Sequence, residues 1–130
     1  MIWLIHSAMA ALYPRTDAFP GVADCGLDAF LVKFKRDTTL LVWSGVLLGA
    51  IVFHLTPLLT VYVPLPALLL PRSLLDKHAD RILSTRLYLV RQIVFLMKLI
   101  AGLCWGTHPE IRQKLGLPVY AEDPGTWKTT

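Results

Sequence analysis

The chain of 130 residues has the length of a single domain, and its composition is unusually apolar. Hydrophobic residues make up 55% of it, charged residues only 17%, and the mean hydropathy is +0.54. Soluble domains carry roughly 25% charged residues, which argues against an ordinary soluble globule, and so much apolar surface excludes intrinsic disorder. The composition therefore indicates a small membrane protein or membrane-associated protein.

The net charge of +4 results from 13 Lys and Arg against 9 Asp and Glu. Eight of the basic residues lie between Arg72 and Lys114, beside apolar runs, and this distribution suits the anionic headgroups of lipids. Nucleic-acid-binding proteins carry a denser basic stripe with exposed aromatic residues. We therefore expect a lipid bilayer as a partner and no nucleic acid.

The N-terminal segment 1–36 is predicted to contain two short helices with a loop between them. Ile2–Leu12 is an apolar helix that Pro14 ends, and no positively charged region precedes it as in a signal peptide. Residues 14–26 are rich in Pro, Gly and Asp, which is typical of an ordered loop. Apolar residues at helical spacing then predict a short amphipathic helix from Leu27.

The dominant feature is an uncharged stretch, since residues 38–71 include no Asp, Glu, Lys or Arg. A bilayer needs ~20 apolar helical residues to cross its hydrocarbon core of about 30 Å, and Thr38–Val63 would supply roughly 39 Å of helix at ~1.5 Å per residue. Pro57 interrupts the stretch. Three interpretations stay open: a helix over Thr38–Thr56 crosses the bilayer, the stretch forms a bent hairpin in one leaflet, or an apolar helix packs on a partner subunit.

Two glycines in this stretch, Gly45 and Gly49, have the GxxxG spacing that lets a second helix approach closely. The pattern is also frequent by chance in membrane helices. We take Gly45 and Gly49 as the candidate residues for helix packing in the membrane.

Segment 72–116 is predicted to form amphipathic helices. Arg86–Trp105 is strongly apolar, but it carries Arg91 and Lys98 seven residues apart and hence on one side of a helix, so it is not a convincing second span. These two cations either reach the headgroups or pair with acidic residues of a partner. Segment 117–130, with Tyr120 and Trp127, is predicted to be an extended arm that either wraps on a partner or frays.

No set of convergent reactive groups marks a catalytic site, so we expect no catalytic, cofactor-binding or metal-binding residue. His54 stands alone in the uncharged stretch, as a hydrogen-bonded neutral imidazole or as a haem or quinone contact. His54 and His78 could be proposed as a haem-binding pair, but Lys77 and Asp80 flank His78 on a polar stretch. Cys25 and Cys104 either pair in a disulfide or stay as two buried thiols.

Two regions resemble the gluconate 2-dehydrogenase subunit 3 family. The first is Leu12-Tyr13-Pro14-Arg15-Thr16-Asp17, followed by Pro20-Gly21, Asp24 and Gly26-Leu27-Asp28-Ala29-Phe30-Leu31. The second is Ser84–Gly116, whose Pro109-Glu110-Ile111-Arg112 and Leu115-Gly116 look like the family's C-terminal helix. This second region is also similar to the N-terminal extension of long-chain alcohol oxidases of the glucose-methanol-choline class. Together the two regions cover about half the chain, and the first is the more specific.

The resemblance implies a non-catalytic small subunit that accompanies a large flavoprotein dehydrogenase subunit carrying FAD, often with a cytochrome c subunit. In that family the small subunit assists maturation, export or anchoring of the large one. The elements that would face the partner are the loop and the helix with the two cations: Pro14, Arg15, Thr16, Asp17, Pro20, Gly21, Asp24, Arg91 and Lys98.

Two departures from the family pattern favour a membrane-bound variant: the chain has no twin-arginine signal, and its middle segment, 37–71, is more hydrophobic. We therefore expect an all-α, membrane-associated accessory subunit, most simply in a bacterial inner membrane. The alternative is a small structural transmembrane subunit of another respiratory or photosynthetic complex. A third interpretation is a small haem or quinone protein.

Overall fold

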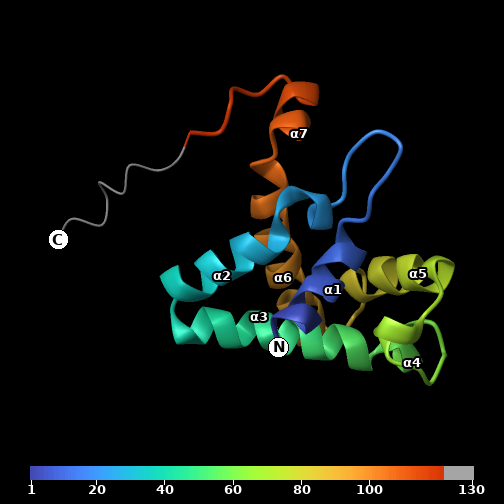
Figure 1. The fold of residues 1–130 in the computed structure, drawn as a ribbon. Coiled ribbons are helices and arrows are strands. Elements are labelled where there is room, and N and C mark those ends of the chain that lie inside the picture. Colours follow the sequence, from blue (N-terminus) through green and yellow to red (C-terminus); the bar gives the residue numbers. More distant parts are fainter. Residues whose placement is uncertain (122–130) are drawn as a thin grey trace.

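The computed structural model describes residues 1–121, and these contain helices and no strand (Figure 1). The expected all-α class is confirmed. The α-helices are Ile2–Leu12 (α1), Leu27–Asp37 (α2), Leu40–Leu55 (α3), Pro57–Thr60 (α4), Arg72–Leu83 (α5), Tyr88–Gly106 (α6) and Pro109–Lys114 (α7). Two 3-10 turns, Val22–Cys25 (η1) and Ala67–Leu69 (η2), lie in the connections.

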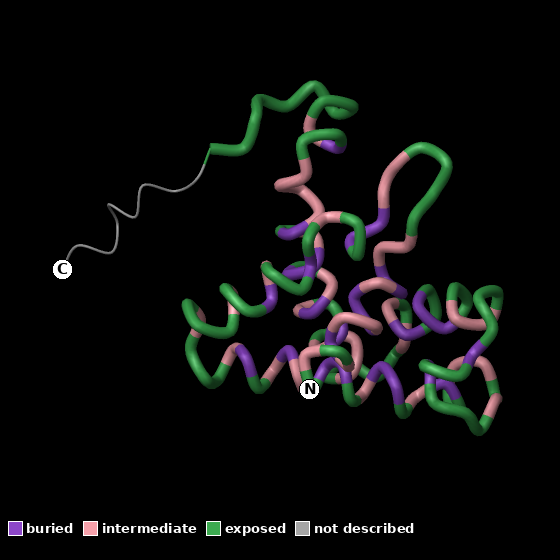
Figure 2. The backbone as a smooth tube through the Cα atoms, in the orientation of Figure 1, coloured by how far each residue is buried: buried purple, intermediate pink, exposed green. Residues whose placement is uncertain are grey.

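Three of the sequence segments, 1–36, 37–71 and 72–116, contribute residues to one shared core. One hydrophobic cluster unites residues of α1, α3, α5 and α6, and its fully buried members include Ile5, Met9, Val46, Phe53, Ile82 and Met97. In Figure 1, α3 lies along the lower edge, α6 rises behind it, and α1 crosses in front. Buried and exposed turns alternate along α3, so this helix covers the core with one side only (Figure 2).

The central contact is the packing of α3 on α6, and two glycines of α3 make it possible. A Cβ atom at Gly49 would lie 3.0 Å from the carbonyl oxygen of Ile93, and one at Gly45 would lie 3.3 Å from a methyl group of Leu96. The small-residue face of α3 is therefore occupied by a helix of the same chain.

Thr38–Val63 does not form one continuous helix, and Pro57 interrupts it as expected. Thr39 begins α3 by accepting a hydrogen bond from the amide of Val42 at 3.4 Å, and α3 ends at Leu55 after 16 residues. Pro57 ends it because proline has no N–H to donate to the carbonyl of Phe53 and its ring crowds that carbonyl. At ~1.5 Å per residue, α3 falls short of the bilayer's core of about 30 Å.

The longest apolar helix in the structure is α6, which lies in the segment that the sequence analysis did not consider a convincing second span. Among the described residues, α6 is the one helix whose 19 residues are long and apolar enough to cross a membrane. Length and composition alone make this a weak indication of a membrane location, because core helices of soluble proteins share both properties. α6 carries Arg91 and Lys98, and α1, α3 and α5 pack against it.

The C-terminal arm is described only in part. Residues 117–121 have no regular structure, and the guanidinium group of Arg112 lies 5.9 Å from the ring centre of Tyr120. This contact places the first residues of the arm beside α7. Trp127, which was expected in the same arm, lies outside the described residues.

Candidate partner-binding loop

The loop between α1 and η1 contains six of the nine predicted partner-binding residues, and a seventh, Asp24, lies in η1. Pro14 and Pro20 keep it from continuing a helix, and Thr16 and Phe19 form its turn. The Phe19 amide donates to the Thr16 hydroxyl oxygen at 3.1 Å, and the Thr16 amide donates to the Phe19 carbonyl at 3.0 Å. Because Val22 N–H also donates to the Tyr13 carbonyl at 3.0 Å, the two ends of the loop meet.

Three residues of the first motif hold one another at the base of this loop. Arg15 Nε and the Gly21 amide both donate to Oδ2 of Asp24, each at 3.0 Å. The hydrogen bond from Arg15, followed by that from Gly21, holds the pKa of Asp24 below its ordinary value. A Cβ atom at Gly21 would lie 2.8 Å from the backbone nitrogen of Arg15, so only glycine fits there. Arg15, Gly21 and Asp24 thus fix the shape of the loop.

The loop is also fastened to the end of α6 and to α7. The indole N–H of Trp105 donates to the carbonyl of Pro20 at 3.0 Å, and the rings of Tyr13 and Phe19 lie 5.8 and 5.6 Å from the Trp105 ring. The ammonium group of Lys114 donates to the Ala18 carbonyl at 2.6 Å. The two regions that carry the family resemblance are therefore in direct contact.

Sequence reasoning did not single out Trp105 and Lys114. Both lie inside the second resembling region, which was the available signal. Their contacts with the loop join residues 85 and 96 positions apart, and no local periodicity reveals such distances.

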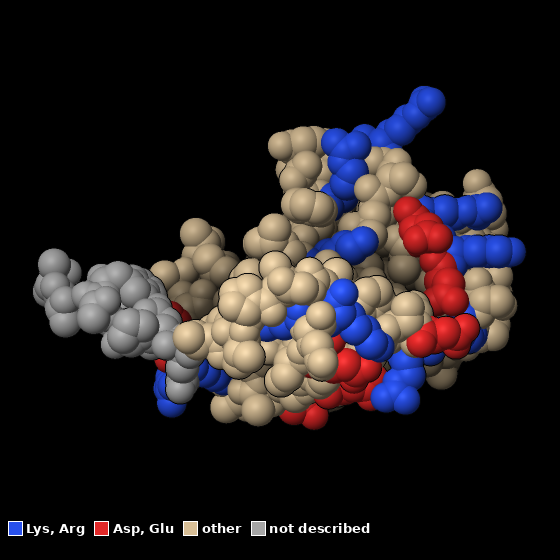
Figure 3. All heavy atoms as spheres, turned by 90° about the horizontal axis from the view of Figure 1, so that it is seen from above, with Lys and Arg blue, Asp and Glu red and all other residues tan. Residues whose placement is uncertain are grey.

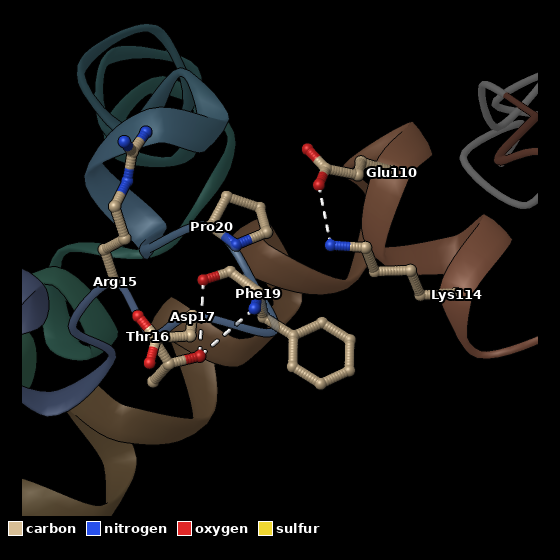
Figure 4. Close-up of a pocket in the computed structure, with 7 residues that line it drawn as sticks. All are labelled: Arg15, Thr16, Asp17, Phe19, Pro20, Glu110 and Lys114. Carbon is tan, nitrogen blue, oxygen red and sulfur yellow. Dashed lines mark hydrogen bonds and ion pairs between the residues drawn. The ribbon is translucent and has the colours of Figure 1, made fainter.

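Between the loop and α7 lies an open pocket of about 310 Å³ (Figure 4). Its lining combines both signs of charge with a phenyl ring: Arg15, Thr16, Asp17, Phe19, Pro20, Glu110 and Lys114. Lys114 donates to Glu110 at 2.8 Å, and this interaction lowers the pKa of the Glu110 carboxyl. Asp17 is exposed on the loop. A pocket lined in this way can recognise a polar, charged segment of another protein.

The two predicted cations of α6 are not presented together on one open surface. Lys98 lines a small cavity of about 140 Å³ together with Pro14 and the α5 carboxylates Asp76 and Asp80, and its ammonium lies 5.6 Å from the Tyr13 ring centre. Arg91 is half-buried, with its guanidinium 5.8 Å from the ring centre of Tyr88. Lys98 is thus directed at its own chain.

Both buried histidines are engaged in contacts between helices. Nε2 of His78 donates to the Phe53 carbonyl at 2.7 Å, and its Nδ1 is bonded to the Thr60 hydroxyl group. Nε2 of His54 lies 3.1 Å from the Leu4 carbonyl oxygen and 3.0 Å from the Ser7 hydroxyl oxygen. Since His78 uses both ring nitrogens, a haem held between these two histidines does not fit this fold.

The two cysteines are free thiols in this fold. Cys104 Sγ lies 3.7 Å from the backbone carbonyl oxygen of Cys25, and desolvation, together with the nearby Asp24 carboxylate, raises the pKa of the Cys25 thiol. Within residues 1–121, no group of three or more His, Cys, Asp or Glu side chains could hold a metal ion.

Comparison with known proteins adds no relative: no family model, no curated protein and no solved structure matches the chain.

Proposed function

We propose that the chain is a non-catalytic accessory subunit that stabilises a FAD-dependent dehydrogenase of the glucose-methanol-choline type and holds it at the membrane. The observation that carries the proposal is the contact between the two resembling regions. Trp105 and Lys114, from the second region, bind the carbonyls of Pro20 and Ala18 in the first. Two motifs that are distant in sequence thereby form one surface.

This surface suits a docking role because its shape is already set before a partner arrives. Backbone hydrogen bonds, the Arg15–Asp24 ion pair and the Trp105 contact hold the loop, so little conformational entropy is lost when it binds. A partner that binds only in its folded form is stabilised by mass action. FAD and the redox chemistry belong to that partner, and a cytochrome c subunit completes the assembly that the resemblance implies.

The membrane part of the proposal is supported by the exposed apolar side chains and by the apolar α6. A bacterial inner membrane is the location that we propose. Anchoring there would keep the flavoprotein near its electron acceptors.

The test is purification of the tagged full-length protein from membranes in mild detergent, followed by identification of the proteins bound to it and an absorption spectrum. We expect a large flavoprotein with the absorption bands of FAD. An Asp17→Lys variant should lose most of that flavoprotein, because it reverses a charge on the rim of the pocket. Asp80→Lys, on α5, is the matched control and should retain it.

A result with integral membrane subunits and no flavoprotein would contradict the proposal. It would favour the alternative, a structural subunit of another respiratory or photosynthetic complex.

A further inference from the structure

The side of α3 that faces away from the core is a continuous aliphatic stripe. Its exposed positions follow the helical repeat: Leu41, Ser44, Leu48, Ile51 and Leu55. Leu41 is 82% exposed and Leu55 is 72% exposed. In a soluble protein this face of a surface helix would carry charged residues. We therefore expect lipid or another protein to shield the stripe from water.

The stripe extends beyond the end of α3. Leu58 and Leu59 of α4 are exposed, as are the two leucines of η2, Leu68 and Leu69. A groove of about 360 Å³ runs beside them and is lined mainly by apolar residues: His54, Leu55, Leu58, Val63, Pro64, Leu65 and Pro66. We call the exposed leucines of α3, α4 and η2, with Ile51, the leucine face.

One hydroxyl group on the leucine face and two backbone carbonyls near it are hydrogen-bonded within the chain. The hydroxyl of Ser44 donates to the Leu41 carbonyl at 2.8 Å. Where Pro57 frees the carbonyl of Phe53, His78 binds it at 2.7 Å, and Arg81 donates to the carbonyl of Thr60 at 2.6 Å. Hydrocarbon tolerates a surface only when its backbone groups are paired in this way.

The charges that flank the leucine face favour an anionic surface. The ammonium of Lys35 lies 5.7 Å from the ring centre of Trp43 at the start of α3, and Arg81 binds the end of α4. Two acidic side chains of the adjoining helices α2 and α5 are paired with arginines, Asp37 with Arg36 and Asp76 with Arg72. The opposite side, seen from above in Figure 3, carries both basic and acidic side chains.

Two aromatic side chains are also strongly exposed. Trp3 is 62% exposed and Tyr62 is 79% exposed. Tyr62 has φ 59°, a left-handed conformation that favours glycine, yet it carries a large exposed ring there. Tryptophan and tyrosine are enriched where a membrane meets water.

Lipid fits the leucine face better than a protein does. The centres of protein interfaces are enriched in aromatic residues, Met and Arg, and form about one hydrogen bond per 100–200 Å². The stripe of α3 offers only aliphatic groups and one hydroxyl that is already bonded.

The shape of the fold favours insertion in the plane of the bilayer. With 16 residues, α3 is too short to cross. If α6 crossed instead, the cavity beside it would bring Lys98, Asp76 and Asp80 into the hydrocarbon.

We propose that the protein inserts into one leaflet of an anionic bilayer through the leucine face, with α3 parallel to the membrane plane. The inference rests on the membrane location in the proposed function and not on the flavoprotein. Capture of the flavoprotein in detergent tests the partner separately from the membrane. Failure of the proposed function and failure of membrane insertion therefore give different results.

The first experiment adds the purified full-length protein, diluted out of detergent, to preformed vesicles of phosphatidylcholine and phosphatidylglycerol, which are then floated on a density gradient. We expect the protein to float, and to float less with phosphatidylcholine alone. The double variant Leu41→Asn/Leu55→Asn should partition at least about ten-fold more weakly, because each exposed leucine loses its transfer into hydrocarbon. Circular dichroism should show an unchanged helix content.

Two further variants control for surface and fold. Leu89→Asn/Leu103→Asn changes exposed leucines of α6 and should float like the unaltered protein. Tyr62→Gly suits the backbone at φ 59°, so it should fold at least as stably while binding vesicles more weakly. Three results would overturn the proposal: an equal loss of vesicle binding in the α6 double variant, no loss in the α3 double variant, or a stable dimer that does not bind vesicles.

A second measurement tests the orientation. A membrane-impermeant amine reagent added outside the vesicles should modify Lys35, Lys77 and Lys114 alike if α3 lies in one leaflet. Protection of Lys35 or Lys114 until the vesicles are lysed would show a crossing helix and overturn the in-plane arrangement.

Discussion

The indole N–H of Trp105 donates a hydrogen bond to the carbonyl of Pro20 at 3.0 Å, across 85 positions of sequence. This contact joins α6 to the loop in which Arg15 is paired with Asp24 of η1. It ties the loop to the helix bundle. A substitution at Trp105 should therefore weaken the binding of a partner to the loop.

The substitution Trp105→Phe keeps a ring against Tyr13 and removes the N–H donor. We expect a loss of about 1 kcal/mol in the free energy of unfolding, the usual net worth of one hydrogen bond, and weaker capture of the flavoprotein. Urea unfolding and the detergent pull-down measure the two effects. Trp3→Phe, at an exposed position, is the control, and equal effects from both variants would count against this role for Trp105.

Local sequence patterns predicted part of this architecture well. The predicted helix Ile2–Leu12 coincides with α1. The segment that was predicted to form amphipathic helices contains α5, which buries one face with His78, Ala79 and Ile82. Both follow from a local signal, a proline that ends a helix or a 3.6-residue repeat.

The candidate site was less accessible to sequence reasoning, because its shape depends on tertiary contacts. The motif identified the loop, but the contact of Trp105 with Pro20 joins distant residues. Charge spacing placed Lys98 on the same side of a helix as Arg91, yet Lys98 is partly buried and shares a cavity with residues of α1 and α5. A helical repeat shows which residues share a face and does not show what packs on it.

Gly21→Ala tests the tight base of the loop. The added Cβ would lie 2.8 Å from the backbone nitrogen of Arg15, and backbone cannot move aside as a flexible side chain can. We expect a destabilisation of roughly 1–3 kcal/mol by overpacking. Gly106→Ala is the matched control: its Cβ meets nothing within 4 Å, and alanine should stabilise the helix end. Chemical unfolding of both variants gives the comparison, and equal stabilities would refute the argument.

His78 should make stability depend on pH. Burial, as the main cause, lowers the pKa of His78 below its ordinary value, although the hydrogen bond to the Phe53 carbonyl acts in the opposite direction. Between the lowered folded pKa and the unfolded value of about 6.5, the unfolded chain binds a proton that the native state does not. Stability is therefore complete above pH ~6.5 and falls as the pH drops below it.

The pH effect is measured by urea unfolding at several pH values between 5 and 8, in the unaltered protein and in His78→Gln. The variant should be less stable at pH 8, because the carbonyl that Pro57 leaves free loses its imidazole donor. It should also lose part of the pH dependence. An identical slope in both proteins would exclude His78 as a source of the effect. Asp24 and Glu110 do not interfere, since their lowered pKa values place their titration at more acidic pH.

A substitution at Lys98 tests whether this side chain stabilises its own chain or contacts the partner. The ammonium lies over Tyr13 and lines a cavity with Asp76 and Asp80, so Lys98→Gln should lower the free energy of unfolding by about 0.5–1 kcal/mol through the lost cation–π contact. Flavoprotein capture should be unchanged, whereas Asp17→Lys should abolish most of it. Were Lys98→Gln to reduce capture without reducing stability, Lys98 would contact the partner as the helix spacing first indicated, and the partner surface would extend from the loop along α6.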